Sequence, residues 1–595
     1  MADSAHDPVI AAIQKILGQS VEMAEANLAW LQTRMHPYFF SCNSEDVEAV
    51  SVLAADLHLL ERNRRFILAD NDRNLIIAQL GELGAVHDAL RSLPERSISY
   101  AQIHTSYGNV PNTNHPLEVL EFSFADGASP APTVAVADEV PAELVQAVQE
   151  EAGARYQDFP GAEVPSLLRL LWRNNPKYVR TSPPARIARL LRLFSRCRSL
   201  GGISLAVERG KGIGAPESRL LFGVANPPDR KFLLQVIDAF RRLHLTVQRS
   251  YCLTVHDGDY PYFLATFYVT TEDGGLIAED STLFQQLRAE MYTTQVMPMT
   301  SLTYDHMIAS GMVGGPDGSL IRAFIGFCHT NLAHAHPDSY DLEGVARAFH
   351  HHPELTLQLV QLFHARFDPA AAAEDYPAVL AETEALVENF NTGRRFLDEF
   401  RRTIFRCGLL LVRHTLKTNF FIAEKRTLAF RLDPAYLEAL GSDFTNDLPA
   451  DRPFRVTYFS SRYGAAYHIG FSDIARGGWR TVITQGRDDY VTAANSLFRE
   501  TYVLAHTQHL KNKDIYEGGS KLVAVLKADE GLDGGRLRQQ LYFLQYGLLS
   551  GFLDLFVTRD GQAADPRIVD YYGEDEPIEL GPDENMHDQM IQLVA

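Results

Sequence analysis

Two glycine pairs, each beside basic residues, constrain this chain more than any other feature. The first pair lies in the segment FSDIARGGWR (471–480), and the second lies in KNKDIYEGGSK (511–521). A third segment, LGPDENM (580–586), follows near the C-terminus. Glycines let a backbone approach a small ligand closely, and the neighbouring cations can hold carboxylates there. The combination suits a site for a small dianionic substrate, although two turns with surface charges are the simpler interpretation of these segments taken alone.

These segments resemble the substrate-binding and dimerisation domain of the large NAD-specific glutamate dehydrogenases. The resemblance is strong over residues 415–595 and weakens towards the N-terminus. Because several linked segments occur in the same order, the resemblance outweighs the interpretation as ordinary turns. The segments that carry it are residues 416–420, 430–434, 473–480, 511–515, 517–521 and 581–585.

The resemblance implies which cations hold the substrate. In the family, a cation before the first glycine pair grips the side-chain carboxylate of glutamate, and Arg476 has that position here. Arg480 matches a neighbouring arginine of the same motif. Lys511 matches the lysine that grips the α-carboxylate, although Lys513 is close enough to compete for this role. Arginine is effectively always charged, which suits Arg476 to anchoring rather than to base chemistry.

The resemblance also implies two catalytic residues. Lys521 matches the catalytic lysine after the second glycine pair, and Asp583 matches the aspartate that handles protons on the amine. A partly desolvated lysine among other cations has a depressed pKa and can act as a base near neutral pH. The glycines that complete the predicted substrate site are Gly477, Gly478, Gly518 and Gly519.

Two positions depart from the family pattern. Leu522 follows the catalytic lysine where relatives usually have glycine, and Tyr516 stands where proline is frequent. These changes would narrow the pocket or shift Lys521.

The implied reaction is the oxidation of L-glutamate by NAD and water to 2-oxoglutarate, ammonium and NADH. Such chemistry requires a nicotinamide, because side chains cannot accept a hydride. In the family a nucleotide-binding domain follows the substrate domain, whereas this sequence stops at Ala595 and contains no strand-linked GxGxxG motif. We therefore expect the chain to be incomplete without a nucleotide domain, and the residues that would bind NAD stay unassigned. The alternative is a non-catalytic amino-acid-binding or assembly subunit.

Composition excludes several other classes of protein. The chain has 595 residues and a formal net charge of −20, which argues against nucleic acid or an anionic membrane as its main partner. No apolar run approaches the roughly 18 residues that a membrane helix requires. The cysteine count is five, without a CxxC pair, which indicates reduced thiols rather than disulfides or a zinc site. We expect a cytoplasmic protein that binds a small molecule and forms a homo-oligomer.

The length suggests several domains in an α+β multidomain fold. We expect a mainly helical region at 1–198 with a linker near 125–141, and a helical connection at 319–450. Between them, residues 199–310 resemble a small α+β sandwich of the ACT type, with a strand at 218–224, a helix at 229–243 and strands at 245–255 and 262–270. Residues 451–595 are expected to form an α/β substrate domain of glutamate dehydrogenase type.

Local patterns predict further elements. Helices are expected at 8–35, 44–95, 142–198, 378–419, 492–508 and 534–558, and an extended segment at 98–124. Strands are expected at 455–459, 466–471 and 522–526.

Two further motifs have simpler structural explanations. The glycine-rich segment 210–214 lacks the lysine-serine ending of a phosphate loop and is predicted to be a hairpin loop. Histidines cluster after the turn-rich joint 311–318, but their spacing does not specify a metal site, so we predict none. These histidines are His329, His334, His336, His350, His351, His352 and His364.

Overall fold

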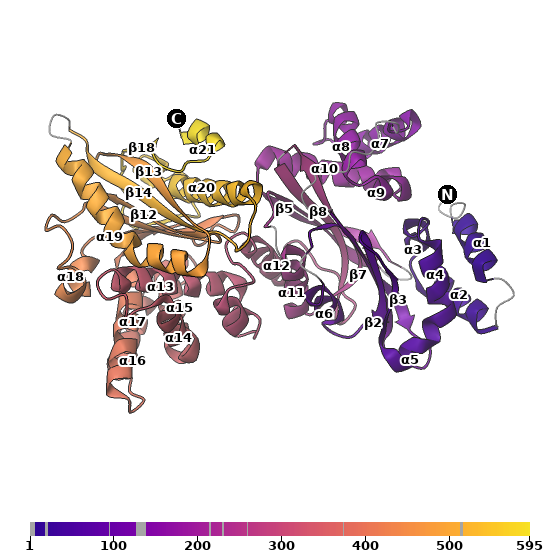
Figure 1. The fold of residues 1–595 in the computed structure, drawn as a ribbon, viewed down its shortest axis with the longest axis horizontal. Coiled ribbons are helices and arrows are strands. Elements are labelled where there is room, and N and C mark those ends of the chain that lie inside the picture. Colours follow the sequence, from indigo (N-terminus) through magenta and orange to yellow (C-terminus); the bar gives the residue numbers. More distant parts are fainter. Residues whose placement is uncertain are drawn as a thin grey trace. The chain divides into compact units, whose positions relative to one another are not determined.

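The computed structural model describes residues 6–17, 22–93, 96–125, 139–212, 216–228, 231–258, 260–372, 374–511 and 516–594. The chain divides into two compact units, Met1–Met291 and Tyr292–Ala595. Both units combine helices with one large sheet, which confirms the mixed α+β class (Figure 1).

The N-terminal unit is built on an eight-stranded antiparallel sheet with the order β1-β2-β4-β3-β7-β8-β6-β5. Each half of the sheet has two strands, a helix and two strands in sequence, and β3 pairs with β7 to join the halves. The predicted strand–helix–strand–strand pattern is therefore present, with β5 preceding it. The elements are β1 (Arg65–Asp70), β2 (Asn74–Leu80), α6 (Ala85–Arg91), β3 (Ile98–Asn109), β4 (Pro116–Phe124), β5 (Ile203–Lys211), β6 (Pro216–Ala225), α11 (Phe232–Arg242), β7 (Leu245–Asp257) and β8 (Tyr260–Thr271).

Helices cover both faces of this sheet. On one face, α11 packs with α6 over aromatic residues such as Phe222 and Phe263. On the other face, α8 and α10 pack against side chains that include Tyr251 and Leu264. The remaining helices of at least four residues are α1 (His6–Leu17), α2 (Glu22–Arg34), α3 (Tyr38–Cys42), α4 (Val47–Asp56), α5 (Leu60–Asn63), α7 (Ala142–Arg155), α8 (Val164–Asn174), α9 (Pro176–Thr181), α10 (Pro184–Leu200) and α12 (Thr282–Thr293).

The prediction of helix throughout residues 44–95 was wrong in its second half. Helical structure ends at Asn63, and the following residues form the β1–β2 hairpin before α6 begins. The turn explains the difference, because the Asn71 side chain accepts hydrogen bonds from the backbone N–H groups of Arg73 and Asn74, at 2.9 and 2.8 Å. Asparagine favours this local turn over helix.

The glycine-rich segment 210–214 joins β5 to β6, in accordance with the predicted hairpin. Its residues Ile213 and Gly214 lie outside the described part of the chain.

The C-terminal unit contains a mixed sheet with the order β17-β9-β10-β11-β12-β14-β13-β18. Strand β13 runs parallel to both of its neighbours, β14 and β18. The predicted strands at 455–459, 466–471 and 522–526 correspond to β11, β12 and β14. The strands are β9 (Thr415–Thr418), β10 (Thr427–Leu432), β11 (Arg455–Ser461), β12 (Gly464–Gly470), β13 (Ala475–Thr484), β14 (Gly518–Lys527), β17 (Val569–Asp570) and β18 (Ile578–Pro582).

Two hydrophobic clusters show that helices cover both faces of this sheet as well. Val523 and Val525 of β14 pack with α13, α17 and α19, whereas Leu522 and Ala524 pack with α20 on the opposite face (Figure 1). This alternation along β14 is that of a strand buried on both sides. The helices of this unit are α13 (Gly315–Ala333), α14 (Leu342–His351), α15 (Pro353–Phe367), α16 (Asp375–Glu388), α17 (Arg395–His414), α18 (Tyr436–Leu440), α19 (Arg487–Lys511), α20 (Gly534–Phe556) and α21 (Asp588–Val594).

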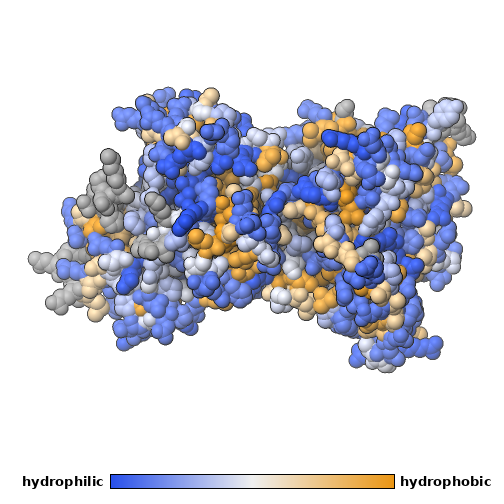
Figure 2. Space-filling view, turned by 180° about the vertical axis from the view of Figure 1, so that it is seen from behind, coloured by the Kyte–Doolittle hydropathy of each residue, from blue (hydrophilic) through white to orange (hydrophobic). Residues whose placement is uncertain are grey.

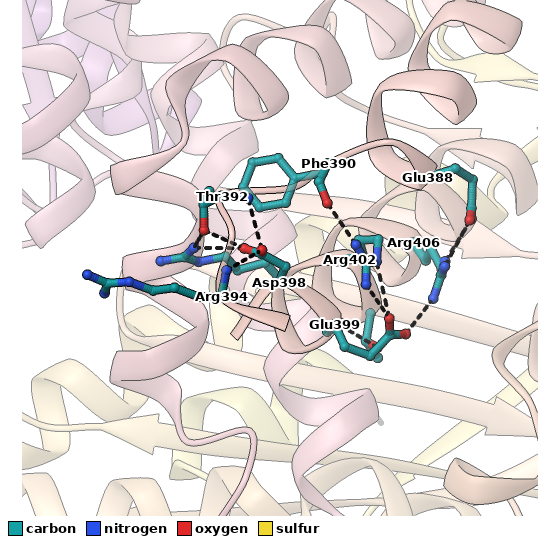
Figure 3. Close-up of polar contacts among 10 residues, drawn as sticks. Glu388, Phe390, Thr392, Arg394, Asp398, Glu399, Arg402 and Arg406 are labelled. Carbon is teal, nitrogen blue, oxygen red and sulfur yellow. Dashed lines mark hydrogen bonds and ion pairs between the residues drawn. The ribbon is translucent and has the colours of Figure 1, made fainter. Parts of the chain in front are cut away.

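A buried carboxylate fixes the connection between α16 and α17 (Figure 3). Asp398, in the first turn of α17, accepts hydrogen bonds from the backbone N–H groups of Thr392 and Arg394, at 2.9 and 3.1 Å. Nearby, Arg402 donates to the Phe390 carbonyl at 2.7 Å. These contacts satisfy backbone groups of the segment between the helices and hold α16 and α17 as a hairpin.

Hydrophilic residues predominate on the face shown in Figure 2, with hydrophobic residues between them. None of the described helices has the length and apolar character that a membrane crossing requires.

Candidate active site

Strand β13 brings the three sequence motifs together. In the register of the sheet, Gly478 of β13 lies level with Lys521 on β14 and with Gly581 on β18. Arg476 lies level with Gly519, two residues earlier on both strands. Residues that are level on parallel strands, or two apart on one strand, share a face of the sheet. Arg476 and Lys521 therefore project from the same face, which is the face covered by α19.

Each of the four predicted glycines has close neighbours within the chain. A Cβ atom on Gly477 would lie 1.8 Å from the Ser520 carbonyl oxygen, and one on Gly519 would lie 1.9 Å from the backbone nitrogen of His509. A Cβ atom on Gly518 would lie 2.3 Å from the Cβ atom of Ser472. These three glycines permit close backbone packing. Gly478 is the glycine that faces the charged residues, because its added Cβ atom would lie 3.0 Å from Asp583.

Lys521 and Asp583 form a direct ion pair between the Nζ and Oδ2 atoms. Their side chains are 15% and 46% exposed, so the lysine is mostly enclosed while the carboxylate faces solvent. A proton can pass between these two groups without an intervening water.

The turn that carries Asp583 is held to β13 by backbone and side-chain hydrogen bonds. The Asp583 N–H donates to the Trp479 carbonyl at 3.1 Å, and the Asn585 side chain donates to the Thr481 carbonyl at 2.9 Å. Asn585 has a φ of 56°, a left-handed conformation that asparagine tolerates. The Gln545 side chain of α20 donates to the Asn585 carbonyl at 2.8 Å. These contacts fix the position of the carboxylate relative to the strand.

The two arginines of the first motif have different surroundings. Arg480 forms ion pairs with Glu500 of α19 and with Glu584, both at 3.0 Å. It therefore ties the helix to the turn that carries Asp583. Arg476 is half-buried, and its side chain has neither a hydrogen bond nor an ion pair with the residues that the structure describes. Its guanidinium group is thus the better placed of the two to receive a substrate carboxylate.

Lys511 is the last residue of α19 and is exposed. The same end of the helix packs over Gly519, where the Gly519 N–H donates to the His509 ring at 3.3 Å. This packing brings the end of α19 to the strand segment that leads into Lys521. The competing Lys513 lies outside the described residues.

A buried ionic cluster behind the site was not predicted from the sequence. Glu576 lies shortly before β18 and is 2.9 Å from Arg431, 3.5 Å from Lys417 and 3.6 Å from Arg455. Each of these four side chains is at most 2% exposed. Arg455 also donates to the Ser472 carbonyl at 2.8 Å, in the loop that leads into β13. The cluster therefore connects the segment before β18 with the segment before β13.

The histidines of the central region lie among polar partners and aromatic rings. His329 contacts Asn495 at 2.8 Å, and His364 contacts Asp317 at 2.8 Å. Burial lowers the pKa of His329 to about 4. Within the described ranges, no group of three or more histidines, cysteines and carboxylates is arranged to hold a metal ion.

Comparison with known proteins shows what this chain is similar to. No family model matches the chain. Over 193 residues, 32% of this chain, it is 36% identical to "Glutamate dehydrogenase 2" of Dictyostelium discoideum. Over 173 residues, 29% of the chain, it is 39% identical to the "NAD-specific glutamate dehydrogenase" of Neurospora crassa. Over 111 residues, 19% of the chain, it is 41% identical to the protein of that name from Saccharomyces cerevisiae.

The matched segments span 17%, 15% and 10% of the lengths of these relatives. The fold and the charged sheet face define a mixed α+β protein with a cluster of cations around a lysine–aspartate pair. The repeated matches to proteins of one name support membership of the NAD-specific glutamate dehydrogenase family for the matched part of the chain.

Proposed function

We propose that the C-terminal unit binds L-glutamate and 2-oxoglutarate as the substrate-binding part of an NAD-dependent glutamate dehydrogenase. The observation that carries this proposal is the shared sheet face of Arg476 and Lys521, with Asp583 in contact with Lys521. A dicarboxylate needs two cationic anchors. Arg476 is proposed to hold the side-chain carboxylate, and Lys511 or Lys513 to hold the α-carboxylate.

The proposed chemistry divides proton handling between two groups. Asp583 Oδ2 takes a proton from the substrate amine, which leaves the nitrogen lone pair free to form the carbon–nitrogen double bond as the α-carbon loses its hydride. Asp583 releases that proton to solvent and then accepts the proton of Lys521, which leaves Lys521 Nζ neutral. Neutral Lys521 takes a proton from the water that attacks the α-carbon. Asp583 then protonates the departing nitrogen and takes the hydroxyl proton as the carbonyl forms and ammonia leaves. The direct Lys521–Asp583 contact lets the two groups exchange a proton between these steps.

NAD supplies the hydride acceptor when it is bound, since no side chain can do so. The glycine-rich segment 210–214 does not fit a dinucleotide, because it joins two antiparallel strands rather than a strand and a helix. We therefore assign no residue of the described chain to NAD and propose that a nucleotide domain must be supplied for turnover.

Further proposals concern the organisation of the protein. We propose that residues 451–595 form a glutamate dehydrogenase-type substrate domain and that residues 199–310 form an ACT-like module. The antiparallel strands β6, β7 and β8 with α11 on one face support the second proposal. We also propose that the protein works as a homo-oligomer in the cytoplasm.

The test is NADH formation from glutamate by the purified chain, alone and with the nucleotide-binding domain of a relative added in trans. We expect turnover only with the added domain, and we expect Lys521→Ala to abolish it while dicarboxylate binding persists. Turnover by the chain alone would contradict the proposed need for a second domain. No turnover in trans, together with no dicarboxylate binding, would favour a non-catalytic assembly subunit.

A further inference from the structure

Four arginines lie in the N-terminal unit between α10 and one face of the sheet. Arg186 and Arg189 come from α10, Arg219 comes from β6 and Arg249 comes from β7. Arg186, Arg189 and Arg249 are 3%, 8% and 1% exposed, and the side chain of Arg219 is 15% exposed. These elements are distant in sequence, so the folded chain gathers the four cations.

Fewer carboxylates than arginines face this cluster. Glu217 lies 2.5 Å from Arg249. Glu208 lies 3.0 Å from Arg219 and 3.6 Å from Arg189. Among the described residues, Arg186 pairs with no carboxylate, and Arg189 and Arg219 share Glu208. Because a buried charge without a counter-ion costs several kcal/mol, this excess of positive charge requires an explanation.

Arg186 is the most distinctive member of the cluster. Its guanidinium group lies between the rings of Tyr38 and Tyr251, 4.3 and 4.1 Å from their centroids. One terminal nitrogen donates to the Cys42 Sγ atom at 3.4 Å, and the other has no hydrogen-bond partner in the described chain. Stacking between two rings fixes the plane of the guanidinium group and leaves its edge available to an anion.

Several other buried polar atoms in the same layer also find no hydrogen-bond partner among the described residues. They are the Tyr251 hydroxyl, Arg189 Nε and Arg219 Nε. More than about nine-tenths of buried polar groups in folded proteins have partners, so such a concentration of available donors points to a polar ligand.

The neighbouring ionisable groups indicate a positive local potential. Burial would raise the pKa of the Tyr268 hydroxyl, yet Arg186, Arg219 and Arg249 together lower it. Burial and the nearby Arg249 and Arg186 lower the pKa of His36 to about 3. His36 is therefore neutral near pH 7 and adds no charge, so an arriving anion would meet the arginines alone.

We propose that these arginines and the Tyr251 hydroxyl form a binding site for a small oxyanion. The ligand class is a molecule with one carboxylate or phosphate group that the edge of Arg186 and the side chain of Arg189 would hold. An oxyanion would neutralise part of the excess positive charge and accept hydrogen bonds from the available donors. The site belongs to the N-terminal unit, so it is separate from the residues proposed to bind glutamate.

Thermal unfolding of the full chain, followed by calorimetry, tests this proposal. Sodium phosphate, sodium acetate or disodium succinate would replace sodium chloride at constant ionic strength. We expect at least one anion to raise the Tm in a saturable way, because a ligand that binds only the folded state stabilises it. Saturation with phosphate alone would identify a phosphate site, and saturation with acetate or succinate would identify a carboxylate site.

Variants test whether the arginine cluster causes the anion-dependent rise in Tm. Arg186→Gln is expected to weaken the anion affinity at least tenfold, whereas Arg196→Gln, at an exposed position of the same helix, is expected to leave it unchanged. If Arg186→Gln does not fold, Arg219→Gln near the rim of the cluster serves instead. Succinate can also bind the substrate site proposed at Arg476, so only a response that persists in Arg476→Met is assigned to the arginine cluster. The proposal is overturned if no anion raises the Tm beyond the chloride control. It is also overturned if Arg476→Met removes the response while Arg186→Gln or Arg219→Gln does not.

Discussion

Gly478 lies directly against Asp583: a Cβ atom at position 478 would come within 3.0 Å of both the Cβ and Oδ2 atoms of the aspartate. Because Gly478 is also level with Lys521 on β14, the missing side chain leaves the space in which the lysine and the aspartate meet. The glycine pair therefore contributes to the site through the lysine–aspartate contact.

The first prediction compares alanine at the two glycines of this pair. Gly478→Ala should displace the half-exposed Asp583 side chain, lower turnover in the presence of an added nucleotide domain, and cost less than about 1 kcal/mol of stability, since an exposed side chain can move. Gly477→Ala should instead cost about 1–3 kcal/mol or more, because its Cβ atom would lie 1.8 Å from the Ser520 backbone carbonyl. Urea unfolding and NADH formation measure the two effects. Equal losses of stability in both variants would contradict this account.

The second prediction concerns Glu576. Glu576→Gln should lower the free energy of unfolding by about 3–5 kcal/mol, because it leaves the buried cations Lys417, Arg431 and Arg455 without their shared carboxylate. Chemical denaturation of the full chain measures this loss.

A matched control for Glu576→Gln is Glu438→Gln. Glu438 is 74% exposed and pairs with Arg452 at 2.6 Å, so this change should cost at most about 1 kcal/mol. If the two variants lose the same stability, the buried cluster does not hold the strands as described.

The third prediction concerns the pH dependence of stability. His468 is fully buried in β12, and burial lowers its pKa to about 3, whereas an unfolded histidine has a pKa of about 6.5. As the pH falls below about 6.5, the unfolded state gains a proton that the folded state does not accept until about pH 3. The neutral His468 therefore imposes no such penalty above about pH 6.5. As the pH falls from about 6.5 to about 3, its titration lowers the free energy of unfolding by up to about 1.4 kcal/mol per pH unit.

His468→Leu removes this titration. The difference in unfolding free energy between wild type and variant should change with pH between about 6.5 and 3, and it should be constant above about pH 7. Taking this difference cancels the contributions of the other histidines and the fixed cost of repacking. A difference that does not vary with pH would show that His468 titrates alike in both states.

The sequence predicted those elements whose pattern depends on near neighbours. The short apolar run of β14 and the long apolar pattern of α20 were sufficient to predict a strand at 522–526 and a helix at 534–558. The β1–β2 hairpin was missed because its helix-compatible apolar residues outweighed the signal of the asparagine turn.

The candidate site, too, could be predicted from the sequence only in part. The motifs predicted Lys521 and Asp583, and the structure brings them into contact. The ion pairs of Arg480 with Glu500 and Glu584 could not be predicted, because they depend on where α19 packs. Glu576 was missed for a similar reason, since only the folded sheet brings Arg431 to it. Charged residues within otherwise apolar strands, such as Arg431 in β10, are the signal that could have suggested a buried cluster.

The central claim is that Arg476 holds one carboxylate of the substrate and that Lys511, the first candidate of the two lysines, holds the other. Calorimetric titration of 2-oxoglutarate into the wild-type chain, Arg476→Met and Lys511→Met tests it most directly. We predict weak but measurable binding to the wild type, and a loss of about 1.5–3 kcal/mol in each variant, the contribution of a hydrogen bond to a charged group. Arg480→Met serves as the control and should cost less, because Arg480 already pairs with two carboxylates. Wild-type affinity in both Arg476→Met and Lys511→Met would contradict the proposed site.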